Sequence, residues 1–302
     1  MDGKISNFMQ IAGIRRYELT EGQERGFRVL DCDNGRLRFL LGESKALDVM
    51  QMYCEGKNLS FVSKNGFTLR DVPFARRFEG GMLYTCGLDA VGDVAGREMH
   101  GSHHNTPAKI TRAECTEKGI LIEAEMSETA LFGQNLLFRR RIESGIGDSE
   151  IKIADTLENR GFTDARYCLL YHVNVGYPLL DEGAQIVFDA ASVTPRNDRA
   201  AQNTEDVSII RAPEPGREET CYFLRMNAPR VSLVNRKLGK AFTLGWSGDT
   251  LPRFVLWKSM ASGDYALGFE PATCELDGGF AYRTLPAGQS VCFSLTLGAE
   301  DA

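Results

Sequence analysis

The chain lacks the cysteine patterns that mark disulfide-rich or zinc-binding proteins. Its eight cysteines are scattered over 302 residues, and no two of them form a Cys-x-x-Cys pair. Most lie in apolar, strand-like stretches, where a reduced thiol packs as a small hydrophobic side chain. The sequence therefore favours reduced, buried thiols over disulfides or zinc ligands for Cys32, Cys54, Cys86, Cys115, Cys168, Cys221, Cys274 and Cys292.

Long basic runs and long apolar runs are also missing. No run of Lys or Arg is longer than residues 139–141 and the formal net charge is −6, so the positive footprint of a nucleic-acid-binding surface is absent. No stretch approaches the roughly 20 apolar residues of a membrane-spanning helix, and the first ten residues lack the apolar core of a signal peptide. We therefore expect a cytoplasmic protein whose partners include neither nucleic acid nor a membrane.

Short apolar or alternating stretches recur along the whole chain. They are bounded by Gly, Asn, Asp and Pro, a pattern typical of β-strands. Helical periodicity is scarce, and the best helical candidate, residues 44–52, also fits a strand. The sequence therefore predicts an all-β protein, with its clearest strands at 37–41, 120–126, 136–142, 151–157, 222–226, 231–234, 242–246, 265–269 and 291–297.

No low-complexity segment divides the chain. The most linker-like piece, residues 211–219, is short enough for a surface loop, and no internal repeat is visible. Because large β-sandwiches exceed 200 residues as single units, we expect one domain over residues 1–302.

The run 169–180 contains two polar residues in an otherwise apolar, strand-like context. Successive strand side chains face opposite ways, so His172 and Asn174 are expected to share one face. Polar groups in such a place need hydrogen-bond partners, which a ligand can supply as well as the protein can. The run is therefore a candidate pocket wall.

Three of the four histidines fall within residues 99–108. The glycines and prolines of this segment predict a loop, where an imidazole is available to a ligand. A solvated polar loop is one alternative. Another is a divalent metal held by His100, His104 and a carboxylate, although the spacing matches no tight ligand template.

The stretch 265–273 predicts a strand with two unlike faces. Ala266 and Gly268 leave room for a ligand beside Glu270 on one of these faces. A glutamate at the end of an apolar strand should have a raised pKa, which suits a general base working near neutral pH. A solvated glutamate, or one paired with an arginine, is the alternative.

Two further residue types are candidates for contact with a ligand. Arg76 and Arg77 precede a Gly-Gly turn, and a planar guanidinium there can bind substrate oxygens or make surface salt bridges. Trp257 can form a stacking platform for a sugar or pack in the core.

Four short motifs follow one another in the chain. They are Arg-Phe-Glu-Gly-Gly at 77–81, Met-His-Gly at 99–101 with Asn-Thr-Pro-Ala at 105–108, the run 171–180, and Gly-Phe-Glu-Pro-Ala-Thr at 268–273. In this order they resemble the galactose mutarotase-like superfamily, and more narrowly its aldose 1-epimerase-like DUF4432 family. Residues 46–49 and 195–197 extend the resemblance over nearly the whole chain.

The resemblance implies a β-supersandwich of two large, mostly antiparallel sheets with an open sugar-binding cleft. It further implies an aldose 1-epimerase that interconverts the anomers of a free sugar or sugar derivative without a metal or organic cofactor. His172 would protonate the ring oxygen as general acid, and Glu270 would deprotonate the anomeric hydroxyl as general base. The substrate-binding residues would be Arg76, His100, Asn174, His104 and Trp257.

Two other classes of protein fit the same residues. One is a carbohydrate-binding protein without turnover, and the other is a metal-dependent sugar isomerase built on the histidines of residues 99–108. All three share one scaffold, so only the chemistry of the site separates them.

Overall fold

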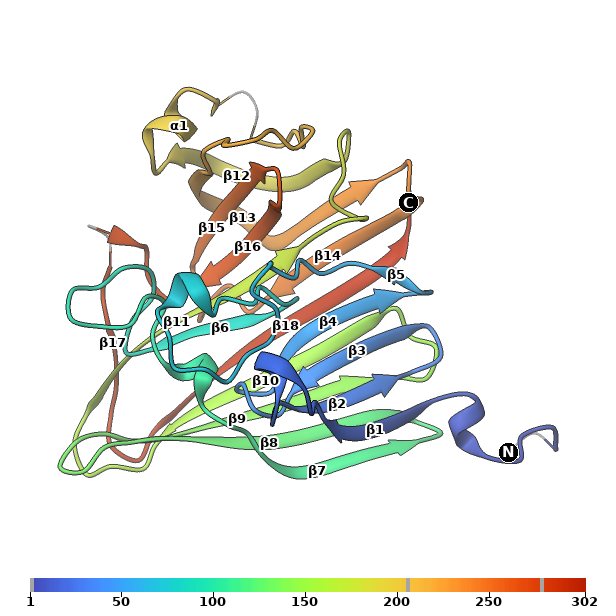
Figure 1. Cartoon of the computed structure of the whole chain (residues 1–302). Helices are drawn as coiled ribbons and strands as arrows, with labels where there is room; N and C mark the ends of the chain where they lie inside the picture. The colour runs from blue at the N-terminus through green and yellow to red at the C-terminus, as the bar shows by residue number, and fades with distance from the viewer. Residues whose placement is uncertain (1–2, 205–206, 278–279) are drawn as a thin grey trace.

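Two antiparallel sheets make up the computed structural model, which describes residues 3–204, 207–277 and 280–302 (Figure 1). The smaller sheet has five strands in the order β1-β2-β3-β4-β5. Their bounds are β1 Gly13–Glu18, β2 Arg28–Asp33, β3 Leu37–Gly42, β4 Asp48–Cys54 and β5 Lys57–Asn58.

The larger sheet has thirteen strands, with the main order β17-β11-β16-β15-β13-β14-β18-β10-β9-β8-β7. Strand β12 pairs with β13, and β6 pairs with β11. The bounds are β6 Tyr84–Leu88, β7 Lys109–Thr116, β8 Gly119–Thr129, β9 Asn135–Ser144, β10 Glu150–Asn159, β11 Ala165–Val175, β12 Gln185–Pro195, β13 Thr220–Asn235, β14 Lys240–Trp246, β15 Arg253–Ala261, β16 Asp264–Ala272, β17 Arg283–Leu285 and β18 Ser290–Asp301.

Within residues 3–204, 207–277 and 280–302, helical structure is limited to short turns. The described helices are the 3-10 turns η1 Phe8–Gln10, η2 Gly22–Glu24, η3 Phe74–Arg76 and η4 His103–Asn105, and one turn of α-helix, α1 Asp198–Ala201. The all-β prediction is confirmed, and each of the nine predicted stretches lies inside a strand. The helical alternative for residues 44–52 is wrong, because residues 44–47 form a turn and β4 begins at Asp48.

The main core lies between the smaller sheet and the β8–β9–β10–β18 part of the larger one. Strand β8 buries every second side chain, as expected for a strand with one face on the core. Its Ile122 belongs to the same buried cluster as Phe39 of β3 and Leu297 of β18. In Figure 1 the blue strands β2–β4 accordingly lie against the green strands β8–β10.

Strands β11, β16 and β15 lie side by side in the larger sheet, next to the long connection between β5 and β7. That connection carries β6, η3 and η4, and it brings the histidines of residues 99–108 to the sheet. Within the described ranges, no helix is both long and apolar enough to cross a membrane. The cytoplasmic location and the absence of a nucleic acid partner stay predictions.

Candidate active site

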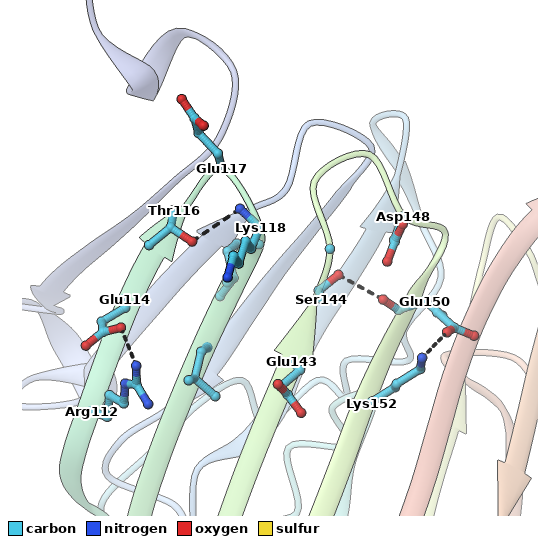
Figure 2. A pocket seen from close by; sticks show the side chains of 14 residues that line it. Arg112, Glu114, Thr116, Glu117, Lys118, Glu143, Ser144, Asp148, Glu150 and Lys152 are labelled. Atoms are coloured by element: carbon cyan, nitrogen blue, oxygen red, sulfur yellow. Dashed lines mark hydrogen bonds and ion pairs between the residues drawn. The ribbon is translucent and has the colours of Figure 1, made fainter. Parts of the chain in front are cut away.

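Two hollows in the described part of the chain are candidate sites. The larger, of about 800 Å³, lies along the ends of β7 to β10 and is lined mainly by charged side chains (Figure 2). Several of these pair with each other, as in Arg112 with Glu114 at 2.7 Å and Lys152 with Glu150 at 2.9 Å. It holds none of the residues that the sequence singled out, and its exposed ion pairs need no ligand.

The second hollow is a cavity of about 500 Å³ beside β11, β15 and β16, within the range typical of small-molecule sites. It brings together four of the seven predicted site residues, His172, Glu270, His100 and Trp257. The remaining lining residues are Phe61, Ser63, Lys64, Asn65, Phe74, Ala75, Phe78, Gly92, Asp93, Met99, Arg196, Glu219, Cys221, Asp264 and Leu276.

His172 and Glu270 meet because β11 and β16 are antiparallel neighbours. Val173 pairs with Phe269, and continuing that register by one residue sets His172 opposite Glu270. The His172 Nε2 and Glu270 Oε1 atoms are 3.2 Å apart, and the two residues are only 5% and 2% exposed. Glu270 Oε1 has no hydrogen-bond partner within the described chain, so this close contact leaves it able to bond a ligand.

Burial sets the protonation of this pair. It raises the pKa of Glu270 to about 8, an effect that the positive charge of Arg196 reduces and the negative charge of Glu219 reinforces. Burial also holds the pKa of His172 well below its usual value, as does the nearby His100. At neutral pH the free protein therefore keeps one proton on the pair, and that proton is on Glu270.

The His172 imidazole is enclosed by rings. The ring centroids of Phe78, Trp257 and His100 lie 5.7, 5.5 and 5.6 Å from that of His172. Trp257 is held in place by its indole nitrogen, which donates a 2.6 Å hydrogen bond to Glu219 Oε2. The immediate surroundings of the His172 imidazole are therefore aromatic.

His100 presents a hydrogen-bond donor to the cavity. Its Nδ1 accepts a hydrogen bond from the Gly92 backbone N–H at 3.2 Å, so the neutral ring carries its proton on Nε2. Burial lowers the pKa of His100 to about 4, and Arg196 contributes to the same shift. The ring is therefore neutral at pH 7, with one N–H left for a ligand.

Gly268 leaves the space that the pair needs. A Cβ at this position would lie 2.6 Å from Glu270 Oε1, 3.1 Å from His172 Cε1 and 3.2 Å from a ring carbon of Trp257. We expect Gly268→Ala to displace the carboxyl group and to lower any catalytic rate about tenfold or more, since small misplacements of reacting groups are costly.

The matched control for this prediction is Gly245→Ala in β14. A Cβ at Gly245 would have no neighbour nearer than 3.9 Å among the described atoms. Activity and thermal unfolding are to be measured for both variants. Equal activity of the two alanine variants would contradict the role given to the space at Gly268.

Three predicted site residues lie outside the cavity lining. Arg76 is exposed at the end of η3, where its neighbours Phe74, Ala75 and Phe78 line the cavity instead. Asn174 is fully buried, and its side-chain amide donates to the His172 carbonyl oxygen at 3.0 Å. It therefore supports the strand that carries His172 rather than facing the cavity.

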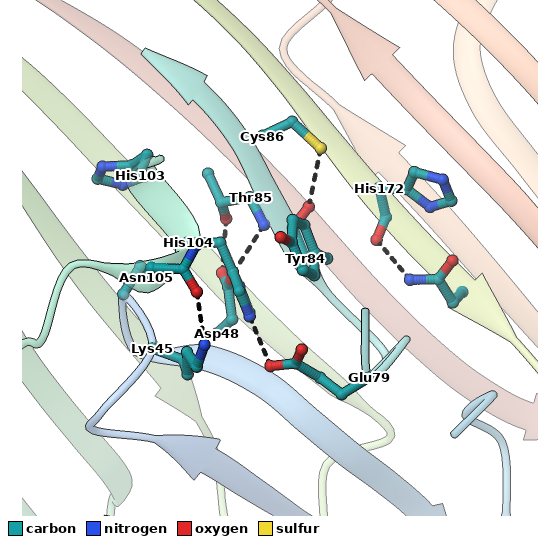
Figure 3. A network of polar contacts seen from close by, with 12 residues as sticks. Lys45, Asp48, Glu79, Tyr84, Thr85, Cys86, His103, His104, Asn105 and His172 are labelled. Atoms are coloured by element: carbon teal, nitrogen blue, oxygen red, sulfur yellow. Dashed lines mark hydrogen bonds and ion pairs between the residues drawn. The ribbon is translucent and has the colours of Figure 1, made fainter. Parts of the chain in front are cut away.

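His104, the third of these, belongs to a buried ionic network (Figure 3). Its Nδ1 lies 2.6 Å from Asp48 Oδ2 and its Nε2 lies 2.7 Å from Glu79 Oε1. Burial opposes the charge on this imidazole, but Glu79 and Asp48 raise the pKa of His104 above its usual value. The ring stacks on Tyr84 at 3.6 Å, and Tyr84 in turn contacts Phe78 of the cavity wall.

The alternative of a solvated loop is therefore wrong for His103 and His104, which are both buried. His103 Nδ1 lies 2.8 Å from Glu128 Oε1 in a pair of its own. His100 and His104 do not converge on one point, and nowhere in the described ranges do three His, Cys, Asp or Glu side chains gather as a metal ion would require.

Sequence reasoning missed Arg196 and Glu219 as lining residues. Arg196 binds Asp277 through two hydrogen bonds of 2.6 and 2.9 Å, and Glu219 holds Trp257. The signal for Arg196 was present, because residues 195–197 contributed to the family resemblance. Glu219 lay in a stretch that had the composition of a linker.

Comparison with solved structures defines the class of fold. A proposed aldose 1-epimerase from Klebsiella pneumoniae superimposes with a TM-score of 0.85 at 20% identity, over 95% of this chain and 83% of that one. A galactose mutarotase-like protein from Clostridium acetobutylicum gives 0.74 at 13% identity, over 97% and 100% of the two chains. The fold is thus the β-supersandwich of galactose mutarotase-like proteins.

The family follows from the sequence itself. Residues 24–289 match the model of the domain of unknown function DUF4432, and the chain belongs to this family. A search of curated proteins gave no match.

Proposed function

We propose that the protein interconverts the anomers of a free sugar or sugar derivative by acid/base ring opening at His172 and Glu270. The observation that carries this proposal is the contact of 3.2 Å between two buried groups that together hold one exchangeable proton on the wall of a cavity. Similarity to solved mutarotase-like proteins supports it.

The arrangement fits the two proton movements of ring opening. The ring oxygen and the anomeric oxygen are bonded to the same carbon, so one edge of the sugar can contact both His172 and Glu270. Transfer of the resting proton from Glu270 to His172 gives an imidazolium and a carboxylate. The imidazolium then protonates the ring oxygen while the carboxylate takes the proton of the anomeric hydroxyl.

The open-chain aldehyde rotates about its bond to the next carbon, and closure reverses both proton transfers. The other anomer forms, and His172 and Glu270 return to their starting protonation states. No electron leaves or enters the sugar, so the residues need only exchange protons with it.

The other residues of the cavity hold the sugar in this proposal. His100 donates its free N–H to a hydroxyl, and Trp257 packs against the apolar face of the ring. Asn174 acts as a positioning residue through the His172 carbonyl group. Arg76 and His104 receive no sugar contact, because both lie outside the cavity lining.

Exchange spectroscopy by NMR tests the proposal directly. Selective inversion of one anomeric proton signal reports the rate at which it becomes the other anomer, and a panel of aldoses and uronates covers the candidate substrates. Acceleration over buffer for any of them supports the proposal. Calorimetric binding without acceleration would instead identify a carbohydrate-binding protein, and the proposed activity would be wrong.

We expect the activity to fall as the pH rises through about 8. The reaction needs one proton on the His172–Glu270 pair, and burial raises the pKa of Glu270 to about 8 whereas that of His172 lies well below its usual value. Above this pH the pair carries no proton to give to the ring oxygen.

A profile of kcat/KM against pH, corrected for the spontaneous reaction, checks this prediction. The fall in kcat/KM near pH 8 should be absent from the residual activity of Glu270→Gln. A rate that stays constant from pH 6 to pH 10 would contradict it, because it would show that Glu270 is already ionised at neutral pH.

A further inference from the structure

The polar side chains on one side of the cavity hold its aromatic walls in place. Ser63 Oγ donates a 2.5 Å hydrogen bond to the Phe78 carbonyl oxygen, and the Asn65 side-chain amide donates to the carbonyl oxygens of Phe78 and Ala75. Glu219 accepts the indole N–H of Trp257. These groups fix Phe78 and Trp257 beside His172, and in doing so they use hydrogen-bonding capacity that a sugar would otherwise take.

The two cationic side chains of the lining, Arg196 and Lys64, are also paired with carboxylates. Arg196 is held by both carboxylate oxygens of Asp277, and the Lys64 Nζ lies 2.7 Å from Asp264 Oδ2. The histidines of the lining are neutral at pH 7, since the pKa of His100 is lowered by burial to about 4 and that of His172 is lowered by the same cause. A negatively charged sugar would therefore meet no unpaired cation in the described lining.

The position of the ring oxygen fixes which part of the sugar meets the aromatic walls. In a pyranose that oxygen joins the anomeric carbon to C5, so a ring oxygen bound to His172 brings the C5 substituent beside the same imidazole. Phe78 and Trp257 flank that imidazole at 5.7 and 5.5 Å. A buried hydroxyl without a partner is costly, and an unpaired carboxylate is more so.

We infer that the preferred substrate is a 6-deoxyhexose, an uncharged aldose whose C5 carries a methyl group in place of a hydroxymethyl or carboxylate group. This inference rests on the proposed function, because it uses the orientation of the ring at His172 and Glu270. The methyl group packs between Phe78 and Trp257, while the remaining hydroxyls take the His100 N–H and the water at the open rim.

Matched triplets of sugars test the preference for a 6-deoxyhexose. D-Galactose, D-fucose and D-galacturonate differ only at C6, and so do D-glucose, D-quinovose and D-glucuronate. Anomer exchange is measured for all six by NMR at pH 7. In at least one triplet we expect kcat/KM for the methyl sugar to exceed that for the hydroxymethyl sugar by about tenfold or more, the scale set by one group in an apolar pocket, with the uronate slowest.

A variant of the wall gives a second readout. Phe78→Tyr adds one hydroxyl to the cavity wall and keeps the aromatic ring. It should therefore lower the ratio of kcat/KM for the methyl sugar to kcat/KM for the hydroxymethyl sugar. Phe162→Tyr is the control, because Phe162 is fully exposed and is not a lining residue. This ratio should be the same in Phe162→Tyr as in the wild type.

The outcomes separate this inference from the proposed function. A ratio at or below one in both triplets, or exchange of uronates alone, would overturn the inference and leave the proposed function standing. If no sugar exchanges faster than in buffer, the proposed function fails, and NMR titration of the same triplets decides the inference. Tighter binding of the methyl sugars would sustain it, and equal or absent binding would overturn it.

Discussion

Glu270→Gln is expected to lower kcat/KM for anomer exchange by about two to four orders of magnitude, the contribution usual for a positioned acid/base group. Glutamine keeps the shape of the side chain and can still form hydrogen bonds, but it cannot accept a proton. The substitution therefore removes the chemical step and leaves the cavity in place.

The same variant should be at least as stable as the wild type at pH 7. Burial raises the pKa of Glu270 to about 8, so folding at neutral pH requires a carboxylate that is ionised in the unfolded chain to take up a proton. That penalty grows as the pH rises from the unfolded pKa toward about 8, and a neutral amide avoids it. Thermal unfolding of both proteins at pH 5 and pH 7 measures the difference.

His172→Asn and the double variant complete the test. If the two residues act as one unit, the double variant should lose little more activity than either single variant. Wild-type activity in Glu270→Gln would show that the catalytic group lies elsewhere. A large loss of thermal stability in this variant would instead point to a structural role for the carboxyl group.

The second large effect concerns stability. We expect Arg140→Met to lower the free energy of unfolding by about 3–5 kcal/mol, because it leaves the buried Asp155 carboxylate without its cation. Arg140 is fully buried, and its guanidinium binds Asp155 at 2.9 and 2.7 Å and also Asp48. Asp155 further accepts the Tyr171 hydroxyl at 2.6 Å, and Arg140 is its one ion-pair partner among the described residues.

Arg141→Met is the matched control for this prediction. Arg141 is the next residue in β9, and its partners Glu123 and Glu143 are partly exposed. Surface pairs of this kind are worth about 0–1 kcal/mol, so the control should unfold almost as the wild type does. Urea unfolding curves of the two variants give the comparison, and similar losses in both would contradict the assigned role of the buried network.

The sequence predicted the strands well because their alternation is a local property. In β8 and β10, the polarity of each side chain indicates whether it faces the core or solvent. The contact between His172 and Glu270 could not be predicted in this way, since it depends on which strands are neighbours and in what register. The short segment 44–52 was ambiguous because its residues fit both the helical and the strand period. Only its pairing with strand β3 decides between the two.

The buried arginine and histidine side chains share one property: their partners lie far away in the sequence. In the run 139–141, alternation along β9 buries Arg140 between two partly buried arginines. Likewise His104 has both ring nitrogens taken by carboxylates that lie 56 and 25 residues away in the chain. Long-range partners of this kind leave no trace in the local sequence, and Arg196 is a further example because its partner Asp277 lies 81 residues away.

The His172–Glu270 pair and the walls of the cavity come from different kinds of structure. His172 and Glu270 stand on paired strands, whereas Phe61, Phe74 and Phe78 belong to the connection between β5 and β7. Loops accept insertions and substitutions more readily than a strand register does. Relatives of this chain can therefore evolve toward new ligands by rebuilding the connection while inheriting the same chemistry, and a protein engineer has the same freedom.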